Sequence, residues 1–507
     1  MSTRYILAHD LGTTGNKAIL VDEEGNIKGS AWFSYPTYMP KPGVAEQNAE
    51  DWWRAVVMST KELIKKEKIS PRDIVAIGIS GLTPNCLPVN REGVPLGRAM
   101  IHMDVRAQPI ATKLEKEISM DFIHRFMLKT GARIDPRVDF VRILWIKNNK
   151  PKIYEKTHKF LQAKDYIVLK LTNVFTTDYT DASLGFGLFN FREKRYDEEA
   201  LDTFGIPLEK LPEPHLSTEI VGEVTEKAAK ETGLNVGTPV IAGAADAAAI
   251  NLGAGAERPN IAVLNLGGSI FVTVLSKKIM DKPHFYFVQI DPDYLGYGVD
   301  LQTGGVCLRW MRDQFCPMEK LVASAIDIDA YRLLDSEAER IKPGSDDLIF
   351  LPYFAGGPSV KFNSKAKGAF FGLTLTHTKA HLIRSIMEGI AYEFRYMIEH
   401  MENLDLEVKE VRLCGGGSKS SLWGKIIASV LGREILVPSY PTDSSAYGAA
   451  LAAGVGVGLF KDLEEAQGRV KLFNRYVPEP EWHDKYERLF TLYKALYDRL
   501  ADLYEQL

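Results

Sequence analysis

The stretch Tyr5-Ile-Leu-Ala-His-Asp-Leu-Gly-Thr-Thr-Gly-Asn-Lys-Ala-Ile-Leu-Val21 decides the fold of this 507-residue chain. The nearly unbroken apolar run from Tyr5 to Ala8 is typical of a strand buried on both faces, and a second apolar run follows from Ala18 to Val21. Between the two runs, Gly12-Thr13-Thr14-Gly15 has the composition of a tight turn. The stretch therefore predicts a β-hairpin.

The tip of this hairpin carries groups that bind phosphate. Gly12, Thr13, Thr14 and Lys17 offer backbone N–H groups, hydroxyls and one cation to an anion. Asp10, where the first strand should end, can hold an accompanying Mg²⁺, directly or through its waters. No Gly-Lys-Ser/Thr follows at the spacing of a Walker loop. The alternative is an ordinary hairpin turn with Asp10 as a local hydrogen-bonding residue.

A weaker copy of this scheme lies far downstream, in Ile261-Ala-Val-Leu-Asn-Leu-Gly-Gly-Ser-Ile-Phe-Val-Thr-Val-Leu275. Here the small polar tip is Gly267, Gly268 and Ser269. Two such hairpins in one chain suggest a duplicated fold with a nucleotide held between the copies. The ATPase architecture shared by actin, Hsp70 chaperones and hexokinases is built in that way.

We therefore expect two α/β domains of the ribonuclease H-like type, with an interdomain cleft. The predicted segments are 1–252, which would bind the substrate, and 253–507, which would bind the nucleotide. A chain of 507 residues also exceeds the length at which one core keeps growing. Gly253 to Pro259 is the expected hinge.

Composition narrows the class of partner. The chain is 45% hydrophobic and 25% charged, as is usual for a soluble protein, and its net charge is −4. This balance gives no electrostatic footprint for nucleic acid or for an acidic membrane surface. We expect small-molecule partners, no nucleic acid and no membrane.

The cysteines and the apolar segments indicate a cytoplasmic protein. Cys86, Cys307, Cys316 and Cys414 form no Cys-x-x-Cys pair and no zinc pattern, so reduced thiols are expected. Asp10 interrupts the only early hydrophobic run, which excludes a signal peptide of the usual form. The apolar segment from Ala446 to Phe460 is shorter than the ~20 residues that cross a bilayer. Its Gly and Ala content indicates close helix packing instead.

The order of elements in the first half fits a ribonuclease H-like domain. We expect a third strand from Ile27 to Tyr35, a helix capped by Asn48, and a buried strand from Ile74 to Ile79. Farther on, Lys164 to Thr172 has the pattern of a helix, and Thr177 to Ser183 that of a polar loop.

Asp246 is a lone acid among small residues, at the exit of the short strand Val240 to Ala242. It stands where a helix through Ala249 should begin, so one interpretation is a helix N-cap. The functional interpretation uses the same geometry. Small neighbours let a substrate approach closely, and the carboxylate can accept a proton from a hydroxyl as it attacks ATP.

Polar residues also follow the strand ends before Asp246. Thr83 and Asn85 lie in Ser80-Gly-Leu-Thr-Pro-Asn-Cys86, while Asp104 and Arg106 end a second loop. These side chains are candidates to face a cleft. The alternative for Asp104 and Arg106 is a surface salt bridge.

Two further glycine-rich segments lie in the second half. Gly304 and Gly305 precede a predicted helix, where the backbone can approach a phosphate. Gly415, Gly416 and Gly417 separate a strand from a helix and predict an adenosine site. Gly454 to Gly458, by contrast, has the pattern of a plain turn.

Two long helices are expected near the end of the chain. Lys379 to Met401 is strongly amphipathic. From Tyr486 to Leu507, apolar residues recur at steps of three and four. That seam would permit a homodimer, although such a terminal helix more often packs on its own domain.

With these residues assembled, the chain resembles the FGGY family of carbohydrate kinases over essentially its whole length. The most specific match is Gly368-Ala-Phe-Phe-Gly-Leu373 followed by His381-Leu-Ile-Arg-Ser-Ile-Met-Glu388, which fits a signature of that family. The resemblance implies that Asp246 is the catalytic base, that Asp10 and Thr13 contact metal and phosphate, and that Gly415 and Gly416 contact the adenine nucleotide. ATP and Mg²⁺ are the implied cofactors.

Within the family, Lys164-Asp-Tyr166 and Thr177 to Ser183 are similar to pentulose kinases such as xylulokinase and ribulokinase. Several loops depart from that pattern. Gly81-Leu-Thr-Pro-Asn85 stands where xylulokinases usually have Gly-Gln-Met-His-Gly, His102 replaces a Trp, and Arg142 replaces the Lys of the second signature. Gly356 to Ser359 lacks the usual Gly-Glu-Arg.

Because these departures lie in the loops and not at Asp104, Arg106 and Asp246, the type of reaction is better predicted than the identity of the substrate. The resemblance implies phosphorylation of a sugar or polyol hydroxyl, with a ketopentose such as xylulose as the expected acceptor and Thr83, Asp104, Arg106 and Asp246 as its binding residues. A ribulokinase, a glycerol kinase or another polyol kinase remains an alternative. An actin- or Hsp70-like ATPase and a non-catalytic sugar sensor are alternatives of a different class.

Overall fold

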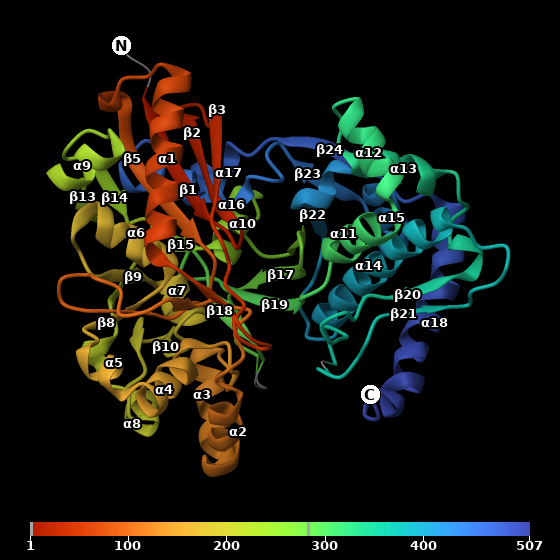
Figure 1. Cartoon of the computed structure of the whole chain (residues 1–507), viewed down its shortest axis with the longest axis horizontal. Helices are drawn as coiled ribbons and strands as arrows, with labels where there is room; N and C mark the ends of the chain where they lie inside the picture. Colours follow the sequence, from red (N-terminus) through yellow and green to blue (C-terminus); the bar gives the residue numbers. More distant parts are fainter. Residues whose placement is uncertain (1–3, 281–283, 362) are drawn as a thin grey trace. The chain divides into compact units, whose positions relative to one another are not determined.

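The computed structural model of the chain describes residues 4–280, 284–361 and 363–507 (Figure 1). The chain forms two compact units, each described here by itself. The first unit comprises Met1–Arg258, Ser276–Tyr297 and Asp443–Val470, and the second comprises Pro259–Leu275, Gly298–Thr442 and Lys471–Leu507.

The compact units differ in detail from the predicted segments 1–252 and 253–507, which remain a prediction about domains. The first unit continues past residue 252 to Arg258, and it also takes in Asp443–Val470. The physical reason for the second difference is helix α16 (Ser444–Gly456), which packs on the sheet of the first unit.

The first unit is built on a mixed sheet with the strand order β13-β14-β5-β1-β2-β3, and β15 pairs with β5 beside this path. Strands β1, β2 and β3 form an antiparallel meander, while β5 runs parallel to β1. The predicted hairpin and third strand are confirmed. The strands are β1 (Tyr5–Leu11), β2 (Gly15–Asp22), β3 (Ile27–Ser34), β5 (Ile74–Gly81), β13 (Ile220–Glu223), β14 (Pro239–Ile241) and β15 (Ala244–Ala245).

The alternation of side chains along β1 decides what lies on each face of this sheet. His9 faces helix α1 (Ala49–Glu67), since its Nε2 lies 3.3 Å from the hydroxyl of Thr60. Asp10, the next residue, faces α16, where it accepts a hydrogen bond from Ser445. Because the side-chain period of a strand is two, this register sets the position of Asp10.

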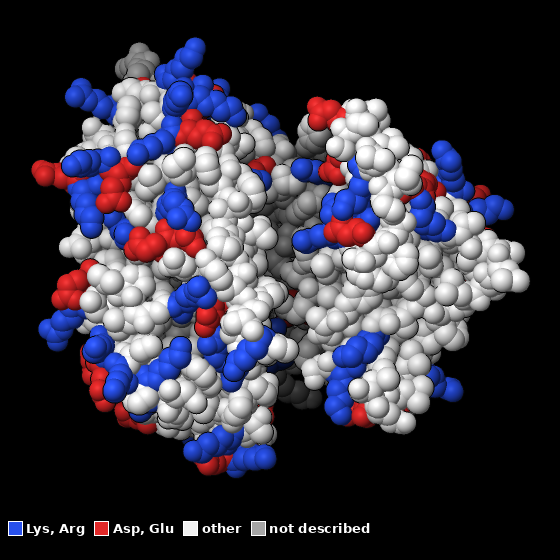
Figure 2. Space-filling model, viewed as in Figure 1, with Lys and Arg blue, Asp and Glu red and all other residues white. Residues whose placement is uncertain are grey.

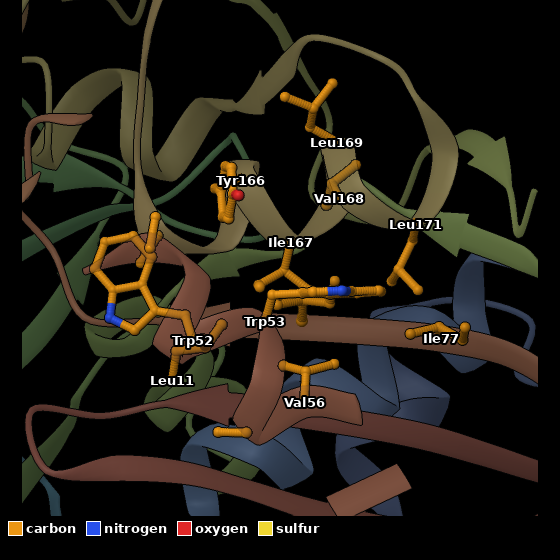
Figure 3. Close-up of a cluster of buried hydrophobic side chains, with 14 of the residues drawn as sticks. Leu11, Trp52, Trp53, Val56, Ile77, Tyr166, Ile167, Val168, Leu169 and Leu171 are labelled. Carbon is orange, nitrogen blue, oxygen red and sulfur yellow. The ribbon is translucent and has the colours of Figure 1, made fainter. Parts of the chain in front are cut away.

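Helix α1 covers one face together with helix α6 (Ala163–Thr172). Asn48 caps α1 as predicted, because its side chain accepts the N–H of Glu50. Figure 3 shows Trp52 and Trp53 of α1 packed among the apolar side chains of α6 and the strand residue Ile77. The core of the first unit lies at this layer.

On the other face, α16 packs against β1, β5 and helix α10 (Asp246–Gly253). A Cβ atom at Gly448 would lie 1.9 Å from the carbonyl oxygen of Ala249, and one at Gly78 would lie 2.2 Å from that of Ala449. Such contacts need glycine, which confirms the predicted close helix packing. The predicted plain turn at 454–458 is wrong at its start, because the helix continues to Gly456.

The remaining elements of the first unit are short. The prediction of a polar loop from Thr177 to Ser183 is wrong. This segment forms the end of β9 and most of helix α7, and Asp178 is the N-cap of that helix. These elements are β4 (Glu46–Gln47), β6 (Leu87–Val89), β7 (Ala99–Met100), α2 (Gln108–Glu117), α3 (Met120–Thr130), α4 (Asp139–Asn149), α5 (Pro151–Lys156), β8 (Lys159–Leu161), β9 (Thr176–Asp178), α7 (Tyr179–Leu184), β10 (Phe189–Asn190), β11 (Arg195–Tyr196), α8 (Glu198–Phe204), β12 (Glu213–His215), α9 (Glu226–Thr232), β18 (Tyr286–Val288) and α17 (Leu463–Gly468).

The second unit repeats this scheme. Its sheet has the order β19-β17-β16-β22-β23-β24, in which β16 is antiparallel to β17 and parallel to β22. Strand β23 is parallel to β22 and antiparallel to β24, as β14 is to β5 and β13. The predicted duplication of the α/β fold is thereby confirmed. The strands are β16 (Ile261–Leu266), β17 (Ile270–Ser276), β19 (Leu295–Leu301), β22 (Glu410–Cys414), β23 (Ile435–Pro438) and β24 (Leu472–Tyr476).

Helices α14 and α18 form much of the core of the second unit. Two buried carboxylates of α14 accept hydrogen bonds from α18. Glu388 accepts one from the hydroxyl of Tyr486, and Glu393 accepts one from the hydroxyl of Tyr493. The other elements are α11 (Gly305–Phe315), α12 (Pro317–Ala325), α13 (Ala330–Glu339), β20 (Ile349–Leu351), β21 (Ala369–Phe371), α14 (Lys379–Glu402), α15 (Ser421–Leu431) and α18 (Pro480–Tyr504). Tyr486, Leu489 and Tyr493 are buried, so the first half of the apolar seam packs within the protein, whereas Leu503 and Leu507 at its end are exposed.

Charges are mixed on the surface. Figure 2 shows basic and acidic side chains interspersed on the visible face, without a continuous field of one sign. Among the described residues, no helix combines the length and apolar character that a membrane span needs.

Candidate functional site

The tip of the β1–β2 hairpin has its carbonyl oxygens occupied. The hydroxyl of Tyr35 donates to the carbonyl of Gly12 at 2.5 Å, and the amide of Gln47 donates to that of Thr13 at 2.7 Å. The backbone N–H of Tyr35 donates to the carbonyl of Thr14. Within the described part of the chain, the N–H groups of Thr13 and Thr14 have no acceptor. The tip therefore presents donors, an arrangement suited to an anion.

Asp10 lies beside this tip, one residue before the end of β1. Its Oδ1 accepts hydrogen bonds from the hydroxyls of Ser445, at 2.9 Å, and Ser80, at 3.3 Å. Burial raises the pKa of Asp10, while the two hydroxyls and the charge of Lys17 oppose that rise.

Lys17 is paired within the first unit. It stands opposite Asp10 in the hairpin register, and its Nζ lies 2.7 Å from Oδ1 of Asp443. Asp443 occupies the residue just before α16. A phosphate bound by Lys17 would have to share this cation with Asp443.

Asp246 is the first residue of α10, directly after β15. The N-cap is Ala245, so the interpretation of Asp246 as the N-cap residue is wrong. Its Oδ1 accepts the N–H of Ala247 at 2.7 Å, and within the described chain its other oxygen accepts no hydrogen bond. Burial raises the pKa of Asp246 to about 7, and the negative charge of Asp10 adds to the rise. The group can thus accept a proton near neutral pH.

The loop before Cys86 is held from behind by helix α6. Oε1 of Gln162 accepts the backbone N–H of Asn85 at 2.9 Å, and the hydroxyl of Thr83 lies 3.5 Å from the same oxygen. The amide nitrogen of Asn85 donates to the carbonyl of Leu82 at 2.5 Å, whereas its buried Oδ1 has no partner within the described ranges of the chain. An unsatisfied buried acceptor is costly unless a ligand or water supplies a donor.

Asp104 and Arg106 form a buried ion pair instead of the surface pair considered above. Asp104 is fully buried, and its carboxylate accepts hydrogen bonds from Nε of Arg106 and from the backbone N–H of Ala45, each at 2.9 Å. Arg106 also donates to Glu46 at 2.8 Å and stacks over Trp145. Although burial opposes the charge, these carboxylates raise the pKa of Arg106. The pair fixes its own loop, and its role in substrate binding stays a prediction.

Arg142 joins the two predicted substrate loops, a role that the sequence did not indicate. Its guanidinium donates to the carbonyls of Pro84 at 3.2 Å and Ile101 at 2.6 Å, and to that of Asp104 at 3.2 Å. Its partner Asp139, at 3.2 Å, has its pKa raised to about 7 by burial. A buried arginine with several carbonyl acceptors is a rigid connection.

Lys164 is the centre of a second buried charge cluster that the sequence did not indicate. Its Nζ lies 2.6 Å from Asp165, 3.0 Å from Asp178 and 3.2 Å from Asp181, and all four side chains are almost completely buried. Its stem packs on the backbone at Gly81. The cluster therefore supports the end of strand β5, from which the loop with Thr83 begins.

In the second unit, the glycine-rich hairpin and helix α11 interlock. The N–H groups of Gly304 and Gly305 donate to the carbonyls of Gly268 and Gly267 at 2.8 and 2.9 Å. These two N–H groups are thus already used, so the backbone of Gly304 and Gly305 supports the tip formed by Gly267, Gly268 and Ser269. Their direct contact with nucleotide stays a prediction.

Two glycines of the run Gly415 to Gly417 are required for packing, and the third has open space beside it. A Cβ atom at Gly415 or Gly417 would lie 2.6 or 2.3 Å from atoms of Leu266, so these two positions need glycine for packing. Gly415 also has a φ of 88°, which favours glycine. At Gly416, by contrast, a Cβ atom would meet nothing within 4 Å. Gly416 is therefore the member of the run with open space beside it.

The FGGY family of carbohydrate kinases matches through its N-terminal domain over residues 5–253 and through its C-terminal domain over residues 262–457. A gluconokinase of Bacillus subtilis (strain 168) is 30% identical over 514 residues, covering 100% of this chain and 98% of that protein. A xylulose kinase of the same organism is 28% identical over 505 residues, covering 99% and 98%.

Solved structures agree with these matches. The crystal structure of gluconate kinase from Lactobacillus acidophilus superposes with a TM-score of 0.87 at 27% identity, covering 100% of both chains.

Proposed function

The chain belongs to the FGGY family of carbohydrate kinases, and from that premise we propose that Asp246 is the general base of a phosphoryl transfer from ATP to a sugar hydroxyl. The chain is a sugar or polyol kinase; the residue roles and the acceptor are the proposal. The observation that carries it is the carboxylate of Asp246. One of its oxygens accepts a backbone N–H, and the other has no donor among the residues that the structure describes. An acceptor hydroxyl can donate to that oxygen.

The base needs only a modest proton affinity. In phosphoryl transfer the protein contributes mainly by positioning the reactants and stabilising charge. A carboxylate whose pKa is near 7 can take the hydroxyl proton as the new O–P bond forms. Its neighbours in the chain are small, and Asp246 and Ala247 are partly exposed, so that an acceptor could approach the carboxylate from this side.

Asp10 fits the role of a Mg²⁺ ligand. One of its oxygens is fixed by two hydroxyls, which leaves the other for a metal or for a water bound to a metal. Among the described residues, no group of three or more His, Cys, Asp or Glu side chains could hold a metal. Mg²⁺ is commonly bound by one or two carboxylates, several waters and substrate phosphates, so this single carboxylate suffices. When bound, Mg²⁺ would neutralise phosphate charge.

Nucleotide binding is proposed for the residues predicted from the sequence. In the first unit these are Gly12, Thr13, Thr14 and Lys17, and the free N–H groups at the tip support them. In the second unit they are Gly267, Gly268, Ser269, Gly304, Gly305, Gly415, Gly416 and Gly417, among which the open position at Gly416 is the best supported.

For the acceptor we propose an uncharged ketopentose such as xylulose. The support is the pairing of the basic side chains in and beside the substrate loops, because an acceptor with a carboxylate would need a cation. Each of these side chains contacts an acidic partner: Arg106 with Asp104 and Glu46, Arg137 with Asp135, Arg142 with Asp139, and Lys164 with three aspartates.

His102 also favours an uncharged acceptor. Burial and the charges of Arg142 and Arg137 lower its pKa to about 4, so the imidazole is neutral at pH 7. A neutral imidazole offers one donor and one acceptor, which suits a hydroxyl. The second candidate is gluconate, which the similarity to gluconokinases favours.

Substrate screening tests this proposal. ADP release, measured with a coupled assay, should be stimulated by xylulose or ribulose more than by glycerol or gluconate. Stimulation by gluconate alone would reject the uncharged acceptor and leave the kinase assignment intact. ADP release without stimulation by any sugar would favour an actin- or Hsp70-like ATPase. Sugar binding in calorimetry without ADP release would indicate a non-catalytic sensor.

Location and assembly follow from the same proposal. Use of ATP and four free, buried cysteines fit a cytoplasmic enzyme. A homodimer through α18 would use the exposed end of the apolar seam, at Leu503 and Leu507, because Tyr486, Leu489 and Tyr493 are buried.

A further inference from the structure

Ser445 contacts Asp10 from a distant part of the sequence. Its hydroxyl lies 2.9 Å from Oδ1 of Asp10 and 2.9 Å from the hydroxyl of Ser80, and the residues Asp10 and Ser445 are 435 positions apart. Ser80 is completely buried and Ser445 nearly so. Three segments, β1, β5 and the first turn of α16, thus meet at one carboxylate oxygen.

The place of the Ser445 hydroxyl is fixed by the packing of α16. Backbone of α16 lies directly on β5 at Gly78 and directly on α10 at Gly448, with no room for a methyl group at either position. The pair of Lys17 and Asp443 holds the residue before the helix. A helix in contact at these points cannot move closer to β5 or to α10 without a clash.

The hydrogen bonds give the Asp10 carboxylate a defined orientation. A carboxylate oxygen only accepts, so the hydroxyls of Ser445 and Ser80 are the donors. Both are directed at Oδ1, and in the described chain no donor reaches Oδ2. One oxygen is therefore anchored and the other is left for a ligand.

We propose that Ser445 is a positioning residue for the metal–nucleotide complex, which it serves by orienting the carboxylate of Asp10. This inference rests on the proposed function, because it assigns Asp10 to Mg²⁺. Ser445 itself need not contact substrate, nucleotide or metal. Without its hydroxyl, Asp10 retains only the longer bond from Ser80 and can rotate.

Calorimetric titration with ADP, in the presence and absence of Mg²⁺, separates this role from a structural one. We expect Ser445→Ala to weaken binding of Mg·ADP about tenfold and to leave binding of metal-free ADP unchanged, since one hydrogen bond to a charged group is lost. The sugar KM should not change. Ser59→Ala is the matched control, because Ser59 is buried on the opposite face of the same sheet and bonds to Asn16.

The outcomes are separable. If Ser445→Ala keeps the wild-type preference for Mg·ADP over ADP, the inference is wrong. If Ser445→Ala does not fold, Ser80→Ala provides the same test, with a smaller loss expected because its bond to Asp10 is longer. If the wild-type protein prefers Mg·ADP but shows no sugar-stimulated ADP release, the proposed function fails, while the role of Ser445 is still decided by the titration.

Discussion

Nζ of Lys17 lies 2.7 Å from Oδ1 of Asp443, so the cation of the first glycine-rich hairpin is joined to the start of α16. Both side chains are partly exposed, at 29% and 21%. The pair and the bond from Ser445 to Asp10 attach the start of α16 to the hairpin on two sides. The hairpin that decides the fold is thus completed by residues near the end of the sequence.

The first prediction concerns this pair. Lys17→Ala should weaken ATP binding about tenfold, because a charge-assisted contact to phosphate is lost. Asp443→Asn should bind ATP at least as well as the wild type, since the charge of Lys17 is no longer shared with the carboxylate of Asp443. A partly exposed ion pair contributes at most about 1 kcal/mol, so neither variant should unfold. Calorimetry and thermal unfolding measure both effects, and unchanged ATP affinity in Lys17→Ala would assign Lys17 to structure alone.

The second prediction concerns pH. The raised pKa of Asp246, about 7, lies above the ordinary value of about 4, so the folded protein favours the protonated form. The stability contributed by this proton is complete below about pH 4 and is lost as the pH rises through 7. Asn cannot ionise, so Asp246→Asn keeps the stability that the wild type loses as the pH rises. The Tm of this variant should exceed that of the wild type by about 2 °C or more at pH 8.

The same variant should differ little from the wild type in Tm at pH 4, where Asp246 of the wild type is protonated in the folded state and about half protonated in the unfolded state. Catalysis has the opposite dependence, because the base must be ionised, so kcat/KM of the wild type should rise with pH and level off above about 7. A Tm difference that is equal at both pH values would contradict the raised pKa.

The third prediction concerns Arg142. Arg142→Lys keeps the charge but cannot donate to as many carbonyls, so the loops with Pro84 and Ile101 should loosen. We expect the KM for the acceptor to rise about tenfold, with ADP affinity unchanged. Arg54→Lys, at an exposed position of α1, is the control. Steady-state kinetics decide the matter, and a change in ADP affinity as large as that in acceptor KM would contradict the assignment.

The fourth prediction uses two neighbouring glycines. Gly417→Ala places a methyl group against Leu266, so it should lower the Tm by roughly 3 °C or more. Gly416→Ala meets no protein atom within 4 Å and should leave the Tm unchanged. If the nucleotide lies against Gly416, this second variant should nevertheless weaken ATP binding. Wild-type ATP affinity in Gly416→Ala would place the adenosine elsewhere.

Local patterns in the sequence were sufficient for much of the fold. The apolar runs around Gly12 and Gly267 predicted both hairpins, and Asn48 predicted the start of α1, because each signal lies within a few residues of the element. The helix expected from Lys379 to Met401 is confirmed as α14, since its apolar stripe is regular.

The site was only partly predictable, because several of its contacts join distant segments. Ser445 lies in a helix of small residues without an amphipathic stripe, so no local pattern predicts that it contacts Asp10. The polar composition of the segment from Thr177 to Ser183 predicts a loop. Its aspartates are instead buried around Lys164, a pairing that only the tertiary structure supplies.

The central claim is that Asp246 takes the proton of the acceptor hydroxyl as it attacks ATP. The most direct test is the rate of sugar-stimulated ADP release by Asp246→Asn, measured at saturating ATP and acceptor at pH 8. We expect a rate lower than that of the wild type by about 10² to 10⁴, with ADP affinity nearly unchanged. A rate equal to that of the wild type would contradict it.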